Sequence, residues 1–169
     1  MTESNHILKG MFTGCGEEAG QALRLKILRP VFETVSVREE LTAYLSQEIK
    51  SSTRVFELFG FMKDEAKEHF LSLHLNAKNR LICLDHISSG SLSASVVHPR
   101  EVFKSTLLSS AAALILMHNH PSGDPTPSRE DIELTQRLNQ GAELLGLRLL
   151  DHVIIGEDRH YSFADHGVL

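Results

Sequence analysis

Apolar residues in the N-terminal part of the chain recur every three or four positions, the spacing that lines one face of a helix. This spacing predicts helices at about residues 17–28, 38–51 and 55–67, with Gly60 as a weak point in the last of them. Residues 1–46 are otherwise weakly patterned. We interpret them as an N-terminal extension, partly helical or flexible, that precedes the main domain.

The hydrophobic period changes after residue 68. Leu71, Leu73 and Leu75 alternate with other residues, as in a strand with one face turned to the core. The pattern predicts, in chain order, a strand at 69–75, a turn at 76–79, a strand at 80–87, a turn at 88–91, a strand at 94–98, a helix at 99–109, a strand at 111–117, a helix at 128–145, and strands at 147–155 and 160–163. Helices and strands alternate irregularly, which predicts an α/β fold of the α+β kind, with a mixed sheet flanked by helices.

The composition is ordinary for a globular chain, with 169 residues, 41% apolar and 23% charged. No stretch approaches about eighteen consecutive apolar residues, and the start of the chain lacks the pattern of a secretory signal. We therefore expect no membrane contact. Two cysteines, Cys15 and Cys83, are too few for a disulfide framework, which predicts reduced thiols in a cytoplasmic protein.

The chemistry concentrates between residues 117 and 131. His118 and His120 end a predicted buried strand, and residues two apart on a strand face the same side. Asp131 lies in the first turn of the next predicted helix. Two imidazoles and one carboxylate form a three-ligand set of catalytic zinc, in which the fourth position holds water.

Each half of this pattern also has a simpler explanation. A histidine pair at strand spacing is more often incidental, and Ser128 followed by Asp131 matches a helix capping box. The histidine pair and the Ser-x-x-Asp pattern together are more specific for a metal site than either alone, because both are expected to place side chains at one point. Capping and metal binding are compatible, since a carboxylate has two oxygens.

The stretch from His118 to Asp131 resembles the JAMM motif of MPN+ (JAB) metalloproteases: His-x-His, seven residues, then Ser-x-x-Asp. Residues 94–101, 118–125, 149–156 and 161–163 are similar to the RadC (UPF0758-like) family of JAB-domain proteins. The resemblance covers about residue 47 to the C-terminus. It implies an MPN (JAB/JAMM) domain at 47–169 with a cytidine-deaminase-like, three-layer architecture.

The resemblance also implies roles for individual residues. His118, His120 and Asp131 would hold one zinc ion, and Ser128 would orient the water or stabilise the tetrahedral intermediate. Glu68 matches the position of the family's catalytic glutamate. Glu65 and Glu101 stay open as alternatives, although Glu101 has its own explanation in the first turn of a predicted helix.

Other candidates are weaker. Asp151 and His152 are adjacent on a predicted strand, so we expect one of them to pack inward and the other to be exposed. Cys83 has no evident histidine partner in the sequence, which disfavours a cysteine-protease interpretation. The serines between residues 88 and 95 form a polar loop or edge strand that could line a substrate cleft.

Two hypotheses follow. The first is a zinc metallopeptidase or isopeptidase acting on a protein or peptide substrate. The second is a RadC-like, DNA-repair-associated accessory protein that binds zinc without peptidase turnover. The net charge of -5 does not support nucleic-acid binding. Only about 45 residues precede the domain, and Gly14-Cys15-Gly16 resembles the turn of a helix-hairpin-helix too weakly to count as one. The chain therefore looks like a short form of the family.

Overall fold

The computed structural model describes residues 31–34, 47–90 and 97–169. Residues 31–34 are exposed and have no regular secondary structure. The predicted helix at 17–28 and most of the one at 38–51 lie outside the described residues. The described end of the second prediction is wrong, because residues 47–51 are not helical and Glu48 instead forms an isolated antiparallel bridge with Arg80.

The helix predicted at 55–67 is two shorter elements. The α-helix α3 runs from Ser52 to Phe59, and Ser51 caps it by accepting a hydrogen bond from the Arg54 amide at 3.2 Å. A 3₁₀-helix, η1, continues from Gly60 to Asp64. Glycine is a poor former of α-helix, and the winding tightens where it occurs.

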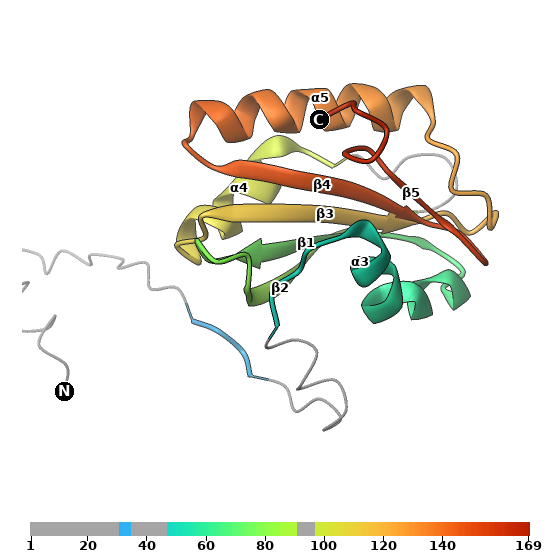
Figure 1. Cartoon of the computed structure of the whole chain (residues 1–169), viewed down its shortest axis with the longest axis horizontal. Coiled ribbons are helices and arrows are strands. Elements are labelled where there is room, and N and C mark those ends of the chain that lie inside the picture. The colour runs from blue at the N-terminus through green and yellow to red at the C-terminus, as the bar shows by residue number, and fades with distance from the viewer. Residues whose placement is uncertain (1–30, 35–46, 91–96) are drawn as a thin grey trace, which may run out of the picture. The chain divides into compact units, whose positions relative to one another are not determined.

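Five strands form a mixed sheet in the order β2-β1-β3-β4-β5 (Figure 1). Their bounds are β1 Glu68–Leu75, β2 Leu81–Gly90, β3 Ala113–Asn119, β4 Arg148–Ile155 and β5 His160–Ser162. β3 and β4 are parallel, and the other neighbouring pairs are antiparallel. This confirms the predicted mixed sheet.

Two predictions near β2 fail. The turn predicted at 88–91 is wrong for its described part, since Ser88, Ser89 and Gly90 continue β2 and pair with the start of β1. Of the strand predicted at 94–98, only Val97 and His98 are described, and neither is in a strand. His98 instead caps the next helix by accepting a hydrogen bond from the Arg100 amide at 3.2 Å.

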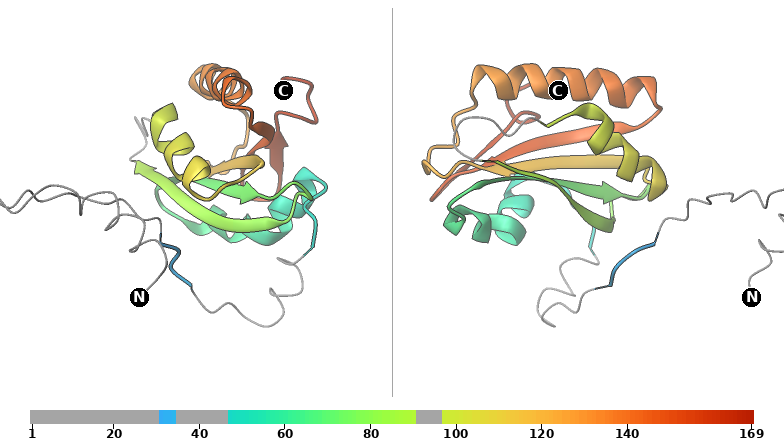
Figure 2. Two further views of the ribbon diagram at one scale, coloured as in Figure 1. Left: turned by 90° about the vertical axis from the view of Figure 1, so that its left-hand side faces the viewer. Right: turned by 180° about the vertical axis from the view of Figure 1, so that it is seen from behind.

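The domain has three layers, which Figure 2 shows edge-on. The helices α4 (Pro99–Leu108) and α5 (Arg129–Leu144) cover one face of the sheet, while α3 and η1 cover the other. Each face has its own apolar core. The α4–α5 core includes Phe70, Val102, Phe103, Leu114, Leu116, Leu138 and Leu149, and the α3 core includes Val55, Leu58, Leu73, Ile115, Met117, Val153 and Ile155.

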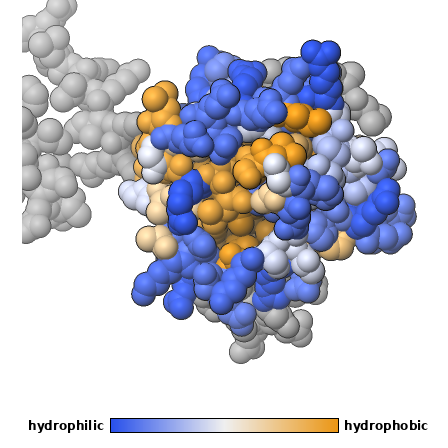
Figure 3. All heavy atoms as spheres, turned by 45° about the horizontal axis from the view of Figure 1, so that its top comes forward, coloured by the Kyte–Doolittle hydropathy of each residue, from blue (hydrophilic) through white to orange (hydrophobic). Residues whose placement is uncertain are grey.

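The face drawn in Figure 3 carries a central hydrophobic area bordered by hydrophilic residues. Within the described residues, Leu144 and Leu107 are among the large apolar side chains that are more than half exposed. Among those residues, we find no helix with the length and apolar character needed to span a bilayer.

Candidate metal centre

His118 and His120 project from the end of β3 toward the layer formed by α4 and α5. Leu114 and Leu116, at the same parity on β3, belong to the core on that side. His118 is fully buried, whereas His120 lies just beyond the strand and is partly exposed. Their Nε2 atoms are 3.1 Å apart. The predicted convergence of the two imidazoles is confirmed.

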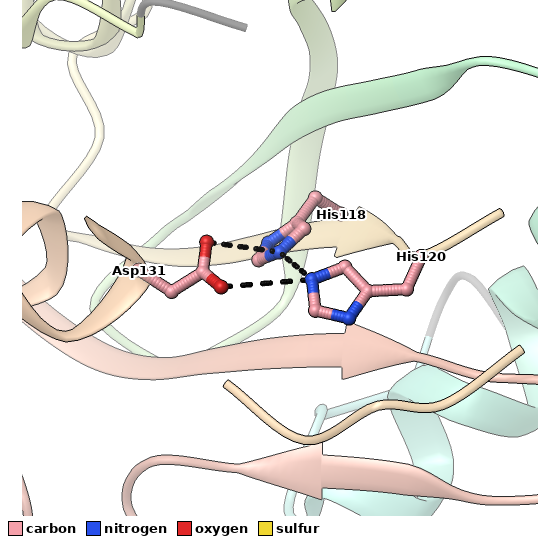
Figure 4. Close-up of side chains that lie close together, drawn as sticks. All are labelled: His118, His120 and Asp131. Carbon is pink, nitrogen blue, oxygen red and sulfur yellow. Dashed lines mark hydrogen bonds and ion pairs between the residues drawn. The ribbon is translucent and has the colours of Figure 1, made fainter. Parts of the chain in front are cut away.

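Asp131 approaches the same point from the first turn of α5. Its Oδ1 atom is 3.3 Å from His118 Nε2, and its Oδ2 atom is 3.5 Å from His120 Nε2. Figure 4 shows the three side chains pointing at one another from the strand and the helix. One ligand atom from each residue lies within 4.8 Å of the others, so together they could hold a metal ion.

A complete capping box fixes Asp131. Ser128 is the N-cap of α5, and its Oγ accepts a hydrogen bond from the Asp131 amide at 3.1 Å. In return, Asp131 Oδ2 accepts hydrogen bonds from the Ser128 amide at 2.7 Å and from the Ser128 hydroxyl at 2.6 Å. Asp131 therefore contributes to both the cap and the ligand cluster. Ser128 acts here through Asp131, and its direct role toward water stays a prediction.

The carboxylate of Asp131 lies between two imidazoles and the Ser128 cap. Burial alone would raise the pKa of Asp131, but its close contacts with His118 and His120 and the hydrogen bonds from Ser128 hold that pKa far below its usual range. Burial would also lower the pKa of His120. Its contacts with Asp131 and the Asp124 carbonyl, together with the charges of Asp131 and Glu68, raise the pKa instead.

The loop after β3 sets the orientation of His120. His120 Nδ1 lies 2.7 Å from the Asp124 carbonyl oxygen, which can only accept, so Nδ1 carries the proton and Nε2 faces the cluster. The loop is tied to the turn after β4 by a hydrogen bond from the Glu157 amide to the Gly123 carbonyl at 2.9 Å. A Cβ on Gly156 would lie 2.5 Å from that carbonyl oxygen, so only glycine allows this approach.

His152 lies behind His118, and the sequence did not reveal it as part of the site. Its Nε2 is 2.9 Å from His118 Nδ1, and its Nδ1 is 2.6 Å from Thr135 Oγ1 on α5. His152 is fully buried, and this burial holds its pKa well below the usual value. The sequence signal that could have found it is a histidine on the strand parallel to β3, where it pairs with Leu116, two residues before His118 on the same face.

The prediction that one of Asp151 and His152 would be exposed is wrong, because both are buried. Asp151 accepts hydrogen bonds from the Ser162 hydroxyl at 2.7 Å, the Ala164 amide at 3.0 Å and the His152 amide at 2.7 Å. β4 is covered on both faces of the sheet. Successive side chains along it therefore point into one or the other of the two apolar cores, and neither set faces solvent.

Glu68 begins β1, which runs antiparallel beside β3. Phe70 pairs with His118. Glu68 lies two residues before Phe70, so its side chain is on the same face of the sheet as those of His118 and His120, toward the end of β3. Its charge also acts on His120. By contrast, the side chain of Glu65 lies 3.6 Å from His69 Nε2, and that of Glu101 pairs with Lys104 and Arg100 on the surface of α4. The assignment of Glu68 as general base stays a prediction that this register supports.

Asn119, between the two ligand histidines, anchors the start of β1. Its Oδ1 accepts a hydrogen bond from the His69 amide at 2.8 Å, and its Nδ2 donates to the Lys67 carbonyl at 3.0 Å. These two bonds flank Glu68. Asn119 is fully buried, and its side chain was not predicted to have a role. No signal in the sequence distinguishes it from an ordinary polar residue at a strand end.

Cys83 has a histidine neighbour that the sequence did not reveal. Its Sγ lies 3.3 Å from His74 Nδ1 on the neighbouring strand β1. Burial raises the pKa of the Cys83 thiol, however, which opposes its activation as a nucleophile. Of the serine-rich stretch, Ser88 and Ser89 belong to β2, and residues 91–96 lie outside the described part.

Comparisons with known proteins give one consistent answer. The family model for the RadC-like JAB domain matches residues 49–168. The chain is 53% identical over 120 residues to a UPF0758 protein of Geotalea uraniireducens, covering 70% of this chain and 53% of that protein. It is 47% identical over 138 residues to a UPF0758 protein of Methanosarcina mazei, covering 81% and 60%. The chain thus spans between half and three fifths of the length of these relatives, and it belongs to the family of proteins with a RadC-like JAB domain.

Proposed function

We propose that this protein is a zinc-dependent metallohydrolase that cleaves a peptide or isopeptide bond. The observation that carries the proposal is the convergence of His118, His120 and Asp131, whose ligand atoms lie within 4.8 Å of one another. Two nitrogens and one carboxylate oxygen are a ligand set of catalytic zinc sites, which leave one position open. Purely structural zinc sites more often use four protein ligands.

The ligand residues suit this role because each is positioned in advance. His118 is buried beneath the helical layer, His120 is oriented by a backbone carbonyl, and Asp131 is fixed by the helix cap. Bound zinc lowers the pKa of a water molecule to about 7 and polarises a substrate carbonyl. The chain itself then needs only a proton acceptor beside the open position.

Glu68 is our candidate for that acceptor. Its carboxylate would take a proton from the attacking water and pass it to the leaving amine. The strand register supports this role, since Glu68 shares a face with His118, and Asn119 anchors the residues on either side of it. A cytoplasmic location and a protein or peptide substrate are further parts of the proposal.

Metal content tests the site. We expect the purified protein to hold about one zinc per chain, measured by atomic emission, and His118→Ala or Asp131→Ala to hold almost none. His86→Ala, which replaces an exposed histidine on β2, serves as the control and should retain zinc. Full zinc occupancy in both ligand variants would contradict the assignment.

Hydrolysis is tested separately with Glu68→Gln, which keeps the shape of the side chain but cannot accept the proton. We expect zinc content to be unchanged and cleavage of a quenched fluorescent peptide library to fall by about 10²–10⁴-fold. Glu65→Gln and Glu101→Gln are the matched controls. If one of these lowers cleavage and Glu68→Gln does not, the base is misassigned.

A further inference from the structure

A chain of hydrogen-bonding groups runs behind the metal centre. It leads from the Asp131 backbone carbonyl to Thr135 Oγ1 at 2.6 Å, then to His152 Nδ1 at 2.6 Å. From there His152 Nε2 lies 2.9 Å from His118 Nδ1. Thr135, His152 and His118 are all fully buried, so no solvent competes for these contacts.

The direction of the chain is fixed at its first member. A backbone carbonyl can only accept, so the single hydroxyl proton of Thr135 points to the Asp131 carbonyl. The Thr135 oxygen can therefore only accept from its other neighbour. That neighbour is His152 Nδ1, which must carry a proton.

The same reasoning continues through the two rings. The His152 ring packs between Phe70 and Phe163, with centroid distances of 5.3 and 5.0 Å, and these apolar surroundings favour the neutral form with one N–H. With that proton on Nδ1, His152 Nε2 accepts. His118 then donates from Nδ1, and its Nε2 keeps a lone pair directed at the ligand cluster.

We propose that Thr135 and His152 are positioning residues for the metal: they hold His118 in the one neutral tautomer that can bind it. This inference rests on the proposed zinc site. The chain begins at the backbone carbonyl of Asp131 and ends at His118, 3.3 Å from the Asp131 carboxylate. The first turns of α5 would thus supply one metal ligand, Asp131, and through Thr135 set which nitrogen of a second ligand, His118, carries the proton.

Removal of the Thr135 hydroxyl should reverse the direction of hydrogen-bond donation between His152 and His118. His152 Nδ1–H would be left buried without an acceptor, which is costly, so His152 would move its proton to Nε2. It would then donate to His118 Nδ1, and His118 would carry its own proton on Nε2. In that tautomer the nitrogen facing the cluster has no free lone pair, and metal binding requires a proton shift first.

Thr135→Val tests this with little change in shape. His152→Phe is the more obvious variant, but His152 is fully buried and its replacement could prevent folding. We expect Thr135→Val to weaken zinc binding about tenfold in a chelator competition, the loss typical of an outer partner of a metal ligand. Thr135→Ser, which restores the hydroxyl, should bind within about twofold of the wild-type protein.

Thr106→Val is the matched control. Thr106 is also buried in a helix, donates to the Val102 carbonyl at 2.7 Å and lies 3.3 Å from a buried histidine, His74, away from the ligands. Its loss should leave zinc affinity within about twofold of the wild-type value. Equal weakening by Thr106→Val and Thr135→Val would mean a general effect on folding and would overturn the inference.

A spectroscopic readout makes the test direct. Long-range ¹H–¹⁵N correlation of the zinc-free protein at pH 8 distinguishes the two histidine tautomers. We expect His118 to be protonated on Nδ1 in the wild-type protein and on Nε2 in Thr135→Val. The same tautomer in both proteins would overturn the inference even if zinc binds. If the wild-type protein binds no zinc, the proposed function itself fails.

Discussion

Two buried histidine clusters lie on the same face of the sheet, at opposite ends of β1 and β3. At one end His152 meets Thr135 of α5, and at the other His74 meets Thr106 of α4. Both threonines donate to the carbonyl four residues earlier in their helix. The two clusters are built from the same local pattern, yet only one belongs to a candidate metal site.

The difference is where each chain of contacts ends. Both ring nitrogens of His74 meet protein groups, with Ser109 Oγ 2.9 Å and Cys83 Sγ 3.3 Å from Nδ1, and Thr106 Oγ1 3.3 Å from Nε2. The chain through His152 instead ends at the Nε2 atoms of His118 and His120 beside a carboxylate. A buried, hydrogen-bonded histidine is therefore not by itself a candidate metal site. A candidate site needs ring nitrogens that converge with a carboxylate, as at His118 and His120.

The gain in stability on zinc binding should distinguish the two histidine clusters most strongly. At a free zinc concentration of 100 times the dissociation constant, zinc should stabilise the wild-type protein by about 2.7 kcal/mol, because it binds only the folded state. His74→Leu should show the same gain, and His118→Ala should show none. Thermal unfolding with and without zinc measures it. Equal stabilisation of His118→Ala would place the metal elsewhere.

His74→Leu should affect stability rather than metal binding. The change removes contacts of a fully buried side chain with Cys83, Ser109 and Thr106, so we expect a loss of about 2 kcal/mol in the free energy of unfolding. Urea unfolding measures the loss, and zinc analysis should still find about one ion per chain. A loss of zinc from His74→Leu would mean that the two clusters are coupled.

The stability gap between the wild-type protein and His74→Leu should narrow as the pH falls from 7 to 5. Burial lowers the pKa of His74 in the folded state, an effect that the charge of Asp85 partly opposes. Below about pH 6.5 the unfolded chain therefore binds a proton at His74 that the folded chain resists, which favours unfolding. His74→Leu lacks this penalty. A gap that widens on acidification would show that the folded protein favours charged His74.

The smallest expected effect concerns Cys83. Burial raises the pKa of its thiol, which leaves less thiolate at pH 8 than an exposed cysteine would have. In a Cys15→Ser background, iodoacetamide should therefore alkylate Cys83 severalfold more slowly than it alkylates a small free thiol. Alkylation that is faster than the free thiol would mean that His74 activates the sulfur.

The sequence alone predicted the ligand cluster, because the necessary geometry is local. Residues two apart at the end of a strand share a face, and Ser-x-x-Asp at a helix start brings a carboxylate to the first turn. His118, His120 and Asp131 span only fourteen positions of the chain. Hydrophobic periodicity likewise predicted the sheet and both helices of one layer. It marked Gly60 only as a weak point within one helix, where the structure has two elements, and it missed the full length of β2. Backbone winding and strand pairing decide where these elements end.

Only the tertiary structure decided what supports those ligands. His152 joins His118 across 34 positions, Thr135 joins His152 across 17, and Asn119 reaches the His69 amide across 50. Such contacts depend on the register between strands and on how α5 packs over the sheet, and neither is encoded in the periodicity of one segment. The sequence therefore determined which atoms converge at the candidate metal centre. The packing of distant elements determined how their protons and orientations are held.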